Sequence, residues 1–326
     1  MNILVTGGAG YIGSHVLKLL LKAGHKVVTL DNLQKGHRQA VTGGQFVVGD
    51  LADRKLLNKV MQENKIEGVI HLAADSLVGE SMEKPAKYYF NNFINGINLL
   101  EAMVANGVKY IVFSSTAAVY GEPKEIPIKE ENLTKPTNTY GESKLFFEKA
   151  LKRYEQIHGL RSISLRYFNA AGADPEGEIG EAHNPETHLI PLILETALGE
   201  REKIYIFGDD YPTRDGSCIR DYIHVNDLAA AHLLAIESLA VKNKSAVYNL
   251  GNGEGYSVKE VIQAVKTVTG RDFPVEIAAR RAGDPAVLIA SSAKIKEELN
   301  WQPEYYQLEK IISTAWEWHK NGGFNK

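Results

Sequence analysis

The chain has 326 residues, of which 44% are hydrophobic and 24% are charged, and its formal net charge at pH 7 is −3. This composition is that of a globular protein, and the length predicts two domains or one large domain with an appendage. The charge argues against a nucleic-acid-binding protein, which needs a clustered basic surface, and no apolar stretch approaches the roughly 20 residues that span a bilayer.

The single cysteine, Cys218, excludes an internal disulfide and predicts a reducing compartment. The N-terminal sequence MNILVTGGAGYIG lacks a charged leader, and glycines interrupt its apolar run after Val5. We therefore expect no signal peptide and a cytoplasmic location.

Short apolar runs alternate with amphipathic segments in the first half of the chain. Runs rich in β-branched residues predict buried strands, and the stretches between them predict helices. The predicted strands are 2–7, 26–31, 45–50, 67–74, 109–115 and 161–169, and the clearest helices are 11–23, 84–107 and about 140–159. Strand–helix alternation predicts an α/β fold with a doubly wound parallel sheet, the Rossmann arrangement, covered on both faces.

The character of the chain changes after Asn169. Residues 170–188 are turn-rich and predict a binding loop or a domain junction. Beyond this stretch, short strands at 203–208 and 246–251 alternate with helices at 226–240, 257–270 and 307–320. We predict a nucleotide-binding domain over 1–168 and a smaller α/β substrate domain over 169–326, with segments at about 217–250 packing back on the first.

The stretch VTGGAGYIGSH joins the first strand to the first helix. Its residues Gly7, Gly10 and Gly13 form a G-x-x-G-x-x-G pattern, one residue longer in its first gap than the common dinucleotide fingerprint. Glycines permit the tight turn and let a pyrophosphate approach main-chain N–H groups at the positive end of a helix. Asp31 ends the second strand, where a carboxylate accepts from the ribose hydroxyls and favours NAD over NADP. Asp50, after the third strand, is placed to meet the adenine edge or to cap a helix.

Tyr140 and Lys144 lie four residues apart in NTYGESKLFFEKAL, which places them on one face of a helix. The strand before them ends in the hydroxyl residues Ser114, Ser115 and Thr116, at the edge where open parallel sheets bind ligands. A cation ~6 Å away, at an effective dielectric constant of ~20, lowers the pKa of a tyrosine by roughly two pH units. Lys144 together with the positive nicotinamide of NAD would bring this pKa near 7, which suits a general base. The same spacing also occurs as surface decoration, but the nucleotide-binding pattern around it favours the catalytic interpretation.

In order along the chain, the motifs TGGAGYIG, SSTAAVYGE and YGESK resemble the extended short-chain dehydrogenase/reductase family. Further stretches, including LRYFNAAGADPEGEIGE, FGDDYPTRDGSCIRDYIHVNDLA and RRAGDPAVLIA, resemble the UDP-glucose 4-epimerases of that family over essentially the full length. The resemblance implies an NAD-binding Rossmann domain and a small domain that grips a UDP-sugar. It also implies interconversion of UDP-glucose and UDP-galactose by transient oxidation to a 4-keto sugar with tightly bound NAD.

The resemblance assigns roles to individual residues. Tyr140 would take the proton of the sugar 4-hydroxyl, Lys144 would bond the nicotinamide ribose, and Thr116 would bridge the sugar and the phenol. Ser76 stands where some relatives have a lysine that reaches the cofactor. The implied cofactor contacts are Gly7, Gly10, Tyr11, Ile12, Gly13, Asp31, Asn32, Asp50, Leu51, Leu72, Ala73, Asn91, Tyr140, Lys144 and Phe168; the implied substrate contacts are Thr116, Asn169, His188, Leu189, Phe207, Arg220, Arg281, Asp284 and Leu288.

Some of these residues have a second interpretation. Arg220 and Arg281 suit a diphosphate because their planar groups bond its oxygens bidentately, although surface ion pairs would also explain them. His183 and His188 flank NPET without a third ligand at metal spacing, so we expect loop residues and no metal site, with His188 near the nucleotide. The isolation of Cys218 favours packing over nucleophilic chemistry.

Leu288 aligns with a position at which some relatives carry a bulky tyrosine, so the resemblance implies room for UDP-N-acetylhexosamines. The alternatives are another NAD-dependent nucleotide-sugar epimerase, a nucleotide-sugar 4,6-dehydratase and a non-catalytic NAD-binding scaffold. A dehydratase has an acid–base pair after the threonine, where Ala117 and Ala118 stand, and a scaffold would have lost the tyrosine or the lysine. The resemblance also implies a homodimer through helices at about 85–106 and 141–158.

Overall fold

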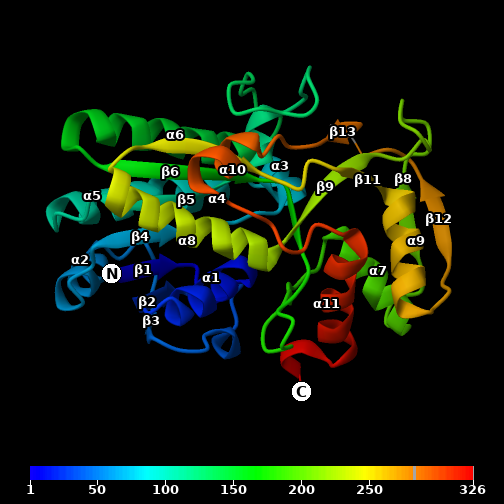
Figure 1. Cartoon of the computed structure of the whole chain (residues 1–326), viewed down its shortest axis with the longest axis horizontal. Coiled ribbons are helices and arrows are strands. Elements are labelled where there is room, and N and C mark those ends of the chain that lie inside the picture. The colour runs from blue at the N-terminus through cyan, green and yellow to red at the C-terminus, as the bar shows by residue number, and fades with distance from the viewer. Residues whose placement is uncertain (282–283, 326) are drawn as a thin grey trace.

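The computed structural model describes residues 1–281 and 284–325, and its centre is a seven-stranded parallel sheet (Figure 1). This sheet confirms the predicted α/β fold. Its strands are, in spatial order, β10 (Ala246–Leu250), β6 (Arg161–Tyr167), β5 (Tyr110–Thr116), β4 (Gly68–His71), β1 (Asn2–Thr6), β2 (Lys26–Asp31) and β3 (Gln45–Val48).

Both faces of the sheet are covered by helices, because successive strand residues point to opposite sides. In β1, Ile3 and Val5 pack in the layer of α1 (Tyr11–Lys22) and α8 (Val225–Lys242), and Leu4 packs in the opposite layer. The helices of that second layer are α2 (Arg54–Glu63), α5 (Asn95–Ala105) and α6 (Thr139–His158). Burial on both sides explains why the strand sequences are apolar without alternation.

The chain leaves the large sheet after β6 and later returns to it. Strand β10 pairs with β6 in parallel register, and α8 covers the same sheet beside α1. The helix α10 (Ala293–Leu299) adds Ile295 and Leu299 to that layer. Thus parts of the second half of the chain, including most of the region 217–250, complete the large sheet.

The remaining part of the second half forms two small sheets beside the large one (Figure 1). One sheet contains β7 (Asn169–Ala171), β9 (Ile219–His224), β11 (Gly255–Ser257) and β13 (Val287–Leu288), and the other pairs β8 (Ile204–Phe207) with β12 (Val275–Ala278). Three helices build a separate apolar core with these strands: α7 (Leu189–Leu198), α9 (Val258–Thr269) and α11 (Leu308–Lys320). In residues 1–281 and 284–325, no helix is both long and apolar enough to cross a membrane.

The helix predicted at 84–107 is divided. It consists of α4 (Pro85–Tyr88), a π-helical turn η2 (Tyr89–Ile94) and α5, and it follows the short helix α3 (Val78–Glu83). Single π-turns often accompany functional sites. Here the turn carries Asn91, which donates to the Asp75 carboxylate at 2.8 Å, and Asn92, which bonds both main-chain groups of Asp75 at 2.8 and 2.9 Å. The π-turn therefore fixes the segment that follows β4.

Candidate active site

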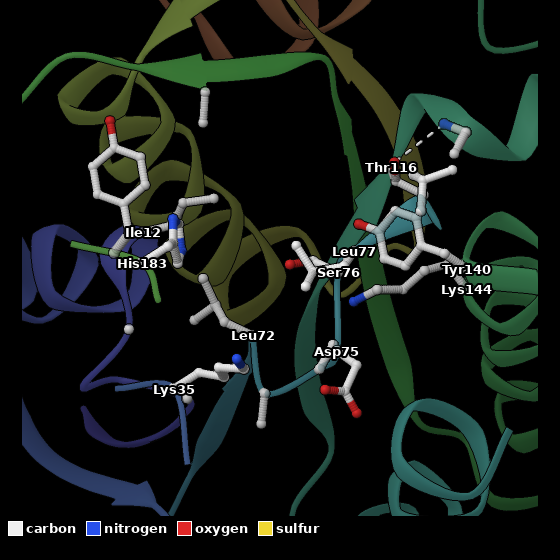
Figure 2. Close-up of a pocket in the computed structure, with 18 of the residues that line it drawn as sticks. Ile12, Lys35, Leu72, Asp75, Ser76, Leu77, Thr116, Tyr140, Lys144 and His183 are labelled. Carbon is white, nitrogen blue, oxygen red and sulfur yellow. Dashed lines mark hydrogen bonds between the residues drawn. The ribbon is translucent and has the colours of Figure 1, made fainter. Parts of the chain in front are cut away.

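A cavity of about 500 Å³ lies at the carboxyl ends of β1, β2, β4 and β5 (Figure 2). This is the edge at which open parallel sheets bind ligands. Side chains from both halves of the chain line it: Figure 2 shows Ile12 and Lys35 of the first half near His183 of the second, with Tyr140 and Lys144 across the cavity.

The glycine loop forms one wall of this cavity. Gly7 has a φ of +74°, and a Cβ atom there would come within 2.5 Å of the Ala73 nitrogen. A Cβ atom at Gly13 would come within 2.1 Å of the Gly7 oxygen. Only glycine fits at these two positions, and the tight turn brings the N-terminus of α1, starting at Tyr11, to the cavity wall. A helix N-terminus so exposed is suited to a diphosphate.

Asp31 ends β2 at the same cavity. Its two carboxylate oxygens accept from the main-chain N–H groups of Ala9 at 3.0 Å and Leu33 at 2.8 Å. Burial raises the pKa of Asp31, and these two hydrogen bonds oppose the increase. The carboxylate is therefore held in a fixed orientation, as recognition of a ribose requires.

Asp50 lies next to Asp31 in the cavity wall. Its carboxylate accepts from the Asn32 amide at 2.7 Å. The N-cap of α2 is instead Asp53, which accepts from the Leu56 N–H at 3.0 Å. The structure thus excludes the role of α2 cap for Asp50, whose other carboxylate oxygen accepts from the Ala52 N–H at 2.8 Å.

Tyr140 and Lys144 project from the first turns of α6 into the cavity, beside Thr116 at the end of β5 (Figure 2). The Lys144 Nζ lies 5.9 Å from the centre of the Tyr140 ring and donates to the Ser114 carbonyl at 2.9 Å. The Asn138 side chain starts the helix by accepting from the Gly141 N–H at 2.8 Å. The structure brings together the three residues predicted to be catalytic.

Burial shifts the pKa values of Tyr140 and Lys144. It raises the pKa of Tyr140, and a hydrogen bond with the Thr116 hydroxyl acts in the opposite direction. It also lowers the pKa of Lys144 to about 7. Desolvation disfavours both the phenolate and the ammonium ion, so in the protein alone the phenol stays protonated. The direction of this pKa shift is opposite to the one estimated for Lys144 alone, and the pKa near 7 with NAD bound stays a prediction.

The structure places most other predicted contacts on the cavity wall, but not all of them. Arg220 bonds the carboxylate of Asp284, and the Arg281 guanidinium lies 4.0 Å from the centre of the Phe207 ring. Arg220 therefore adjoins the cavity through Asp284, whereas Phe207, the partner of Arg281, is not part of the lining. The remaining predicted residues on the wall are Gly10, Leu51, Leu72, Ala73, Asn91, Phe168, Asn169, His188, Asp284 and Leu288, whereas Leu189, Phe207, Arg220 and Arg281 are outside its lining.

Comparison with known proteins identifies the family. Residues 3–251 match the NAD dependent epimerase/dehydratase family. The UDP-glucose 4-epimerase of Halalkalibacterium halodurans is 57% identical to this chain over 320 residues, which are 98% of this chain and 96% of that protein. The chain belongs to the NAD dependent epimerase/dehydratase family. The family resemblance expected from the motifs is confirmed.

Two solved structures extend this similarity. The UDP-glucose 4-epimerase from Bifidobacterium longum in complex with NAD+ and UDP is 39% identical, with a TM-score of 0.93 and coverage of 99% of each chain. The UDP-Glc/GlcNAc 4-epimerase from Campylobacter jejuni is 45% identical, with a TM-score of 0.86 and coverage of 98% of this chain and 99% of that one. The epimerase/dehydratase fold therefore extends over the whole chain.

Several lining residues were given no binding role by the sequence analysis. Lys35 and Asp75 line the cavity, as do Glu181 and His183 of the long loop. The Lys35 Nζ donates to the Asn184 carbonyl at 2.8 Å and so joins two loops 149 residues apart. No local pattern links such distant positions, and only the fold brings them together.

Proposed function

We propose that this chain interconverts UDP-glucose and UDP-galactose as a 4-epimerase with tightly bound NAD. One observation carries the proposal: Tyr140, Lys144 and Thr116 meet in a cavity whose other wall is the glycine loop and Asp31. The sequence similarity to the UDP-glucose 4-epimerase of Halalkalibacterium halodurans supports the same reaction. Ala117 and Ala118 line the cavity after Thr116, where a 4,6-dehydratase would need an acid–base pair.

The residues of the cavity fit a dinucleotide. Gly7 and Gly13 allow the tight turn that brings the N-terminus of α1 to the cavity, since a Cβ atom at either would collide with the backbone, and Asp31 is oriented by two main-chain groups for ribose hydroxyls. Asn91 and Phe168 lie on the same wall for the nicotinamide half. When bound, NAD supplies the acceptor and the donor of a hydride for carbon 4 of the sugar.

The side chains of the protein move and position a proton. The Tyr140 phenolate takes the proton of the 4-hydroxyl as the sugar is oxidised, and the resulting phenol returns it when the 4-keto sugar is reduced on its other face. Thr116 hydrogen-bonds the phenol and orients it toward the substrate. The positive charge of Lys144 stabilises the phenolate. Binding of the substrate and the cofactor favours the protonated, positively charged form of Lys144.

We assign the wall of the cavity that is lined by the second half of the chain to the UDP group of the substrate. Asn169, His188 and Asp284 line it, and Arg220 adjoins it through Asp284. An arginine already bonded to a carboxylate can exchange that partner for phosphate oxygens of similar geometry. This assignment keeps residues 1–168 as the NAD-binding part and most of residues 169–326 as the UDP-sugar-binding part.

The function is tested with the purified chain. We expect NAD to be released on denaturation, detected by absorbance and fluorescence, and UDP-galactose to be converted to UDP-glucose without added cofactor. A chain that carries NAD but converts no UDP-hexose would be a binding scaffold, and the proposal would then be wrong.

Leu288 is proposed to determine how large a sugar the cavity accepts. It lies in β13 beside Arg220 of β9 and packs against the apolar cluster around Phe168. The Leu288→Tyr variant should lose at least about 10-fold in kcat/KM for UDP-N-acetylglucosamine relative to UDP-glucose, because the larger ring occupies space for the N-acetyl group. Parallel assays of both sugars measure this, and an unchanged ratio would contradict the assignment.

We also propose a homodimer through η2, α5 and α6, and a cytoplasmic location in keeping with the single buried thiol, Cys218. On these helices Phe90, Ile94 and Ile157 are large apolar residues with 62%, 42% and 64% exposure. Apolar exposure of this kind marks an interaction surface. Sedimentation should show a dimer for the parent and a monomer for Ile94→Asp, whereas Val241→Asp, at an exposed position on α8, should stay dimeric; a monomeric parent would refute the proposal.

A further inference from the structure

Two histidines and two glutamates of one loop meet at the edge of the cavity. They are Glu181, His183, Glu186 and His188, and one ligand atom of each lies within 4.8 Å of the others. The sequence showed only two histidines without a third ligand. The folded loop supplies the missing carboxylates, because residues 181–188 curl so that all four side chains face one point.

The distances among these atoms match the edges of a small coordination polyhedron. Glu181 Oε1 lies 3.0 Å from His183 Nδ1 and 2.8 Å from His188 Nδ1. Glu186 Oε1 lies 2.9 Å from His188 Nδ1, and Glu186 Oε2 lies 3.7 Å from His183 Nδ1. Metal–ligand bonds of about 2.1 Å in tetrahedral geometry give edges of ~3.4 Å. Since one ligand atom of each residue lies within 4.8 Å of the others, side-chain rotations that shorten the longer separations would bring all four onto one ion.

The surroundings hold these ligands in place. The side chains of Glu181 and Glu186 are only 4% and 7% exposed, so the two carboxylates are withdrawn from water and need compensating positive charge. Contacts from outside the loop fix its main chain: the Trp318 Nε1 donates to the Glu181 carbonyl at 2.8 Å, and the His37 Nε2 bonds the Ala182 carbonyl at 2.6 Å. Such outer contacts orient metal ligands before the ion arrives.

We propose that Glu181, His183, Glu186 and His188 form a binding site for one divalent transition-metal ion, of which Zn2+ fits best. Two imidazoles and two carboxylates suit Zn2+ and exclude Mg2+, which prefers six oxygen ligands. His188 is partly exposed, and His183 and His188 line the cavity, which gives the ion a path of entry. The bound ion would cross-link side chains of residues 181–188, the loop that faces Tyr140 across the cavity. The site shares His188 with the wall assigned to the UDP group, but metal binding is measured without reference to epimerase activity.

Calorimetric titration of the chelator-treated, NAD-loaded chain with ZnCl2 and with MgCl2 tests the site. We expect one Zn2+ per chain with a Kd of about 1 μM or lower, and no heat from Mg2+. His183→Gln and Glu186→Gln should each weaken Zn2+ binding by at least about 100-fold. His158→Gln, at an exposed histidine in the last turn of α6, is the matched control and should bind as the parent does.

Crystals soaked in ZnCl2 give a second readout that does not depend on variants. Anomalous scattering at the zinc edge should show one peak at the centre of the four ligand atoms. Zinc binding that survives both His183→Gln and Glu186→Gln, equal binding of Mg2+, or the lack of a peak at this position would each overturn the proposal.

Discussion

Replacing Tyr140 with phenylalanine should lower kcat for UDP-galactose by about 10³-fold, while the chain still carries NAD. The substitution removes only the phenolic oxygen and leaves the buried ring packed on α6. A positioned acid–base group typically contributes between about 10² and 10⁴ to a rate. Steady-state turnover, with NAD content measured on the same preparation, separates lost chemistry from lost cofactor.

Tyr167 provides a matched control for this variant. It is a second tyrosine in the cavity wall, its phenol hydrogen-bonds the Ser114 hydroxyl, and burial is the largest cause of its raised pKa. Because Tyr167 is not in the catalytic group, Tyr167→Phe should change kcat by less than about tenfold. Equal losses in both variants, or full activity of Tyr140→Phe, would show that Tyr140 is not the acid–base group.

The features that the sequence predicts well are those encoded within a short stretch. Apolar runs predict the strands at 2–7 and 26–31, because each strand is buried on both faces. Tyr140 and Lys144 share a face because four residues make about one helical turn. The glycine loop is equally local, and its backbone packs so closely that only glycine fits at positions 7 and 13.

The features that the sequence hides depend on distant residues or on burial. The four-ligand cluster of residues 181–188 needs the folded loop and the support of Trp318 and His37. The π-turn of residues 89–94 continues directly into α5, so helical periodicity alone predicted one continuous helix. The pairwise charge estimate for Tyr140 left out desolvation, which disfavours the charged forms of Tyr140 and Lys144 alike in the protein without NAD.

A buried ion pair beside the catalytic helix is another such hidden feature. Glu148 follows Lys144 by one turn of α6, and its carboxylate accepts from Arg166 of β6 at 2.9 and 2.5 Å. Both side chains are less than one tenth exposed. Glu148 also accepts from the Ser115 hydroxyl at 2.6 Å, and Arg166 donates to the Tyr120 hydroxyl at 2.9 Å. The pair thus joins α6 to the strand that carries Thr116.

Glu148→Gln should lower the free energy of unfolding by about 3–5 kcal/mol, because it leaves the Arg166 charge buried without a counter-ion. Chemical denaturation of the NAD-loaded parent and variant measures the difference. Glu155→Gln, on the same helix, is the control: Glu155 faces Arg161 at 3.3 Å with about a third of each side chain exposed. An exposed pair of this kind contributes less than about 1 kcal/mol.

The double variant Glu148→Leu/Arg166→Met distinguishes the charge from the packing. If the cost of Glu148→Gln comes from an uncompensated buried charge, removing both charges should recover most of the lost stability, since an apolar pair of similar volume avoids desolvation of either ion. If it comes from the loss of a well-packed hydrogen-bond network, the double variant should be less stable than the single one. The Ser115 hydroxyl then loses its acceptor, and the Tyr120 hydroxyl keeps only its bond to the Asn249 side chain. We expect recovery, and a double variant less stable than Glu148→Gln would contradict the electrostatic explanation.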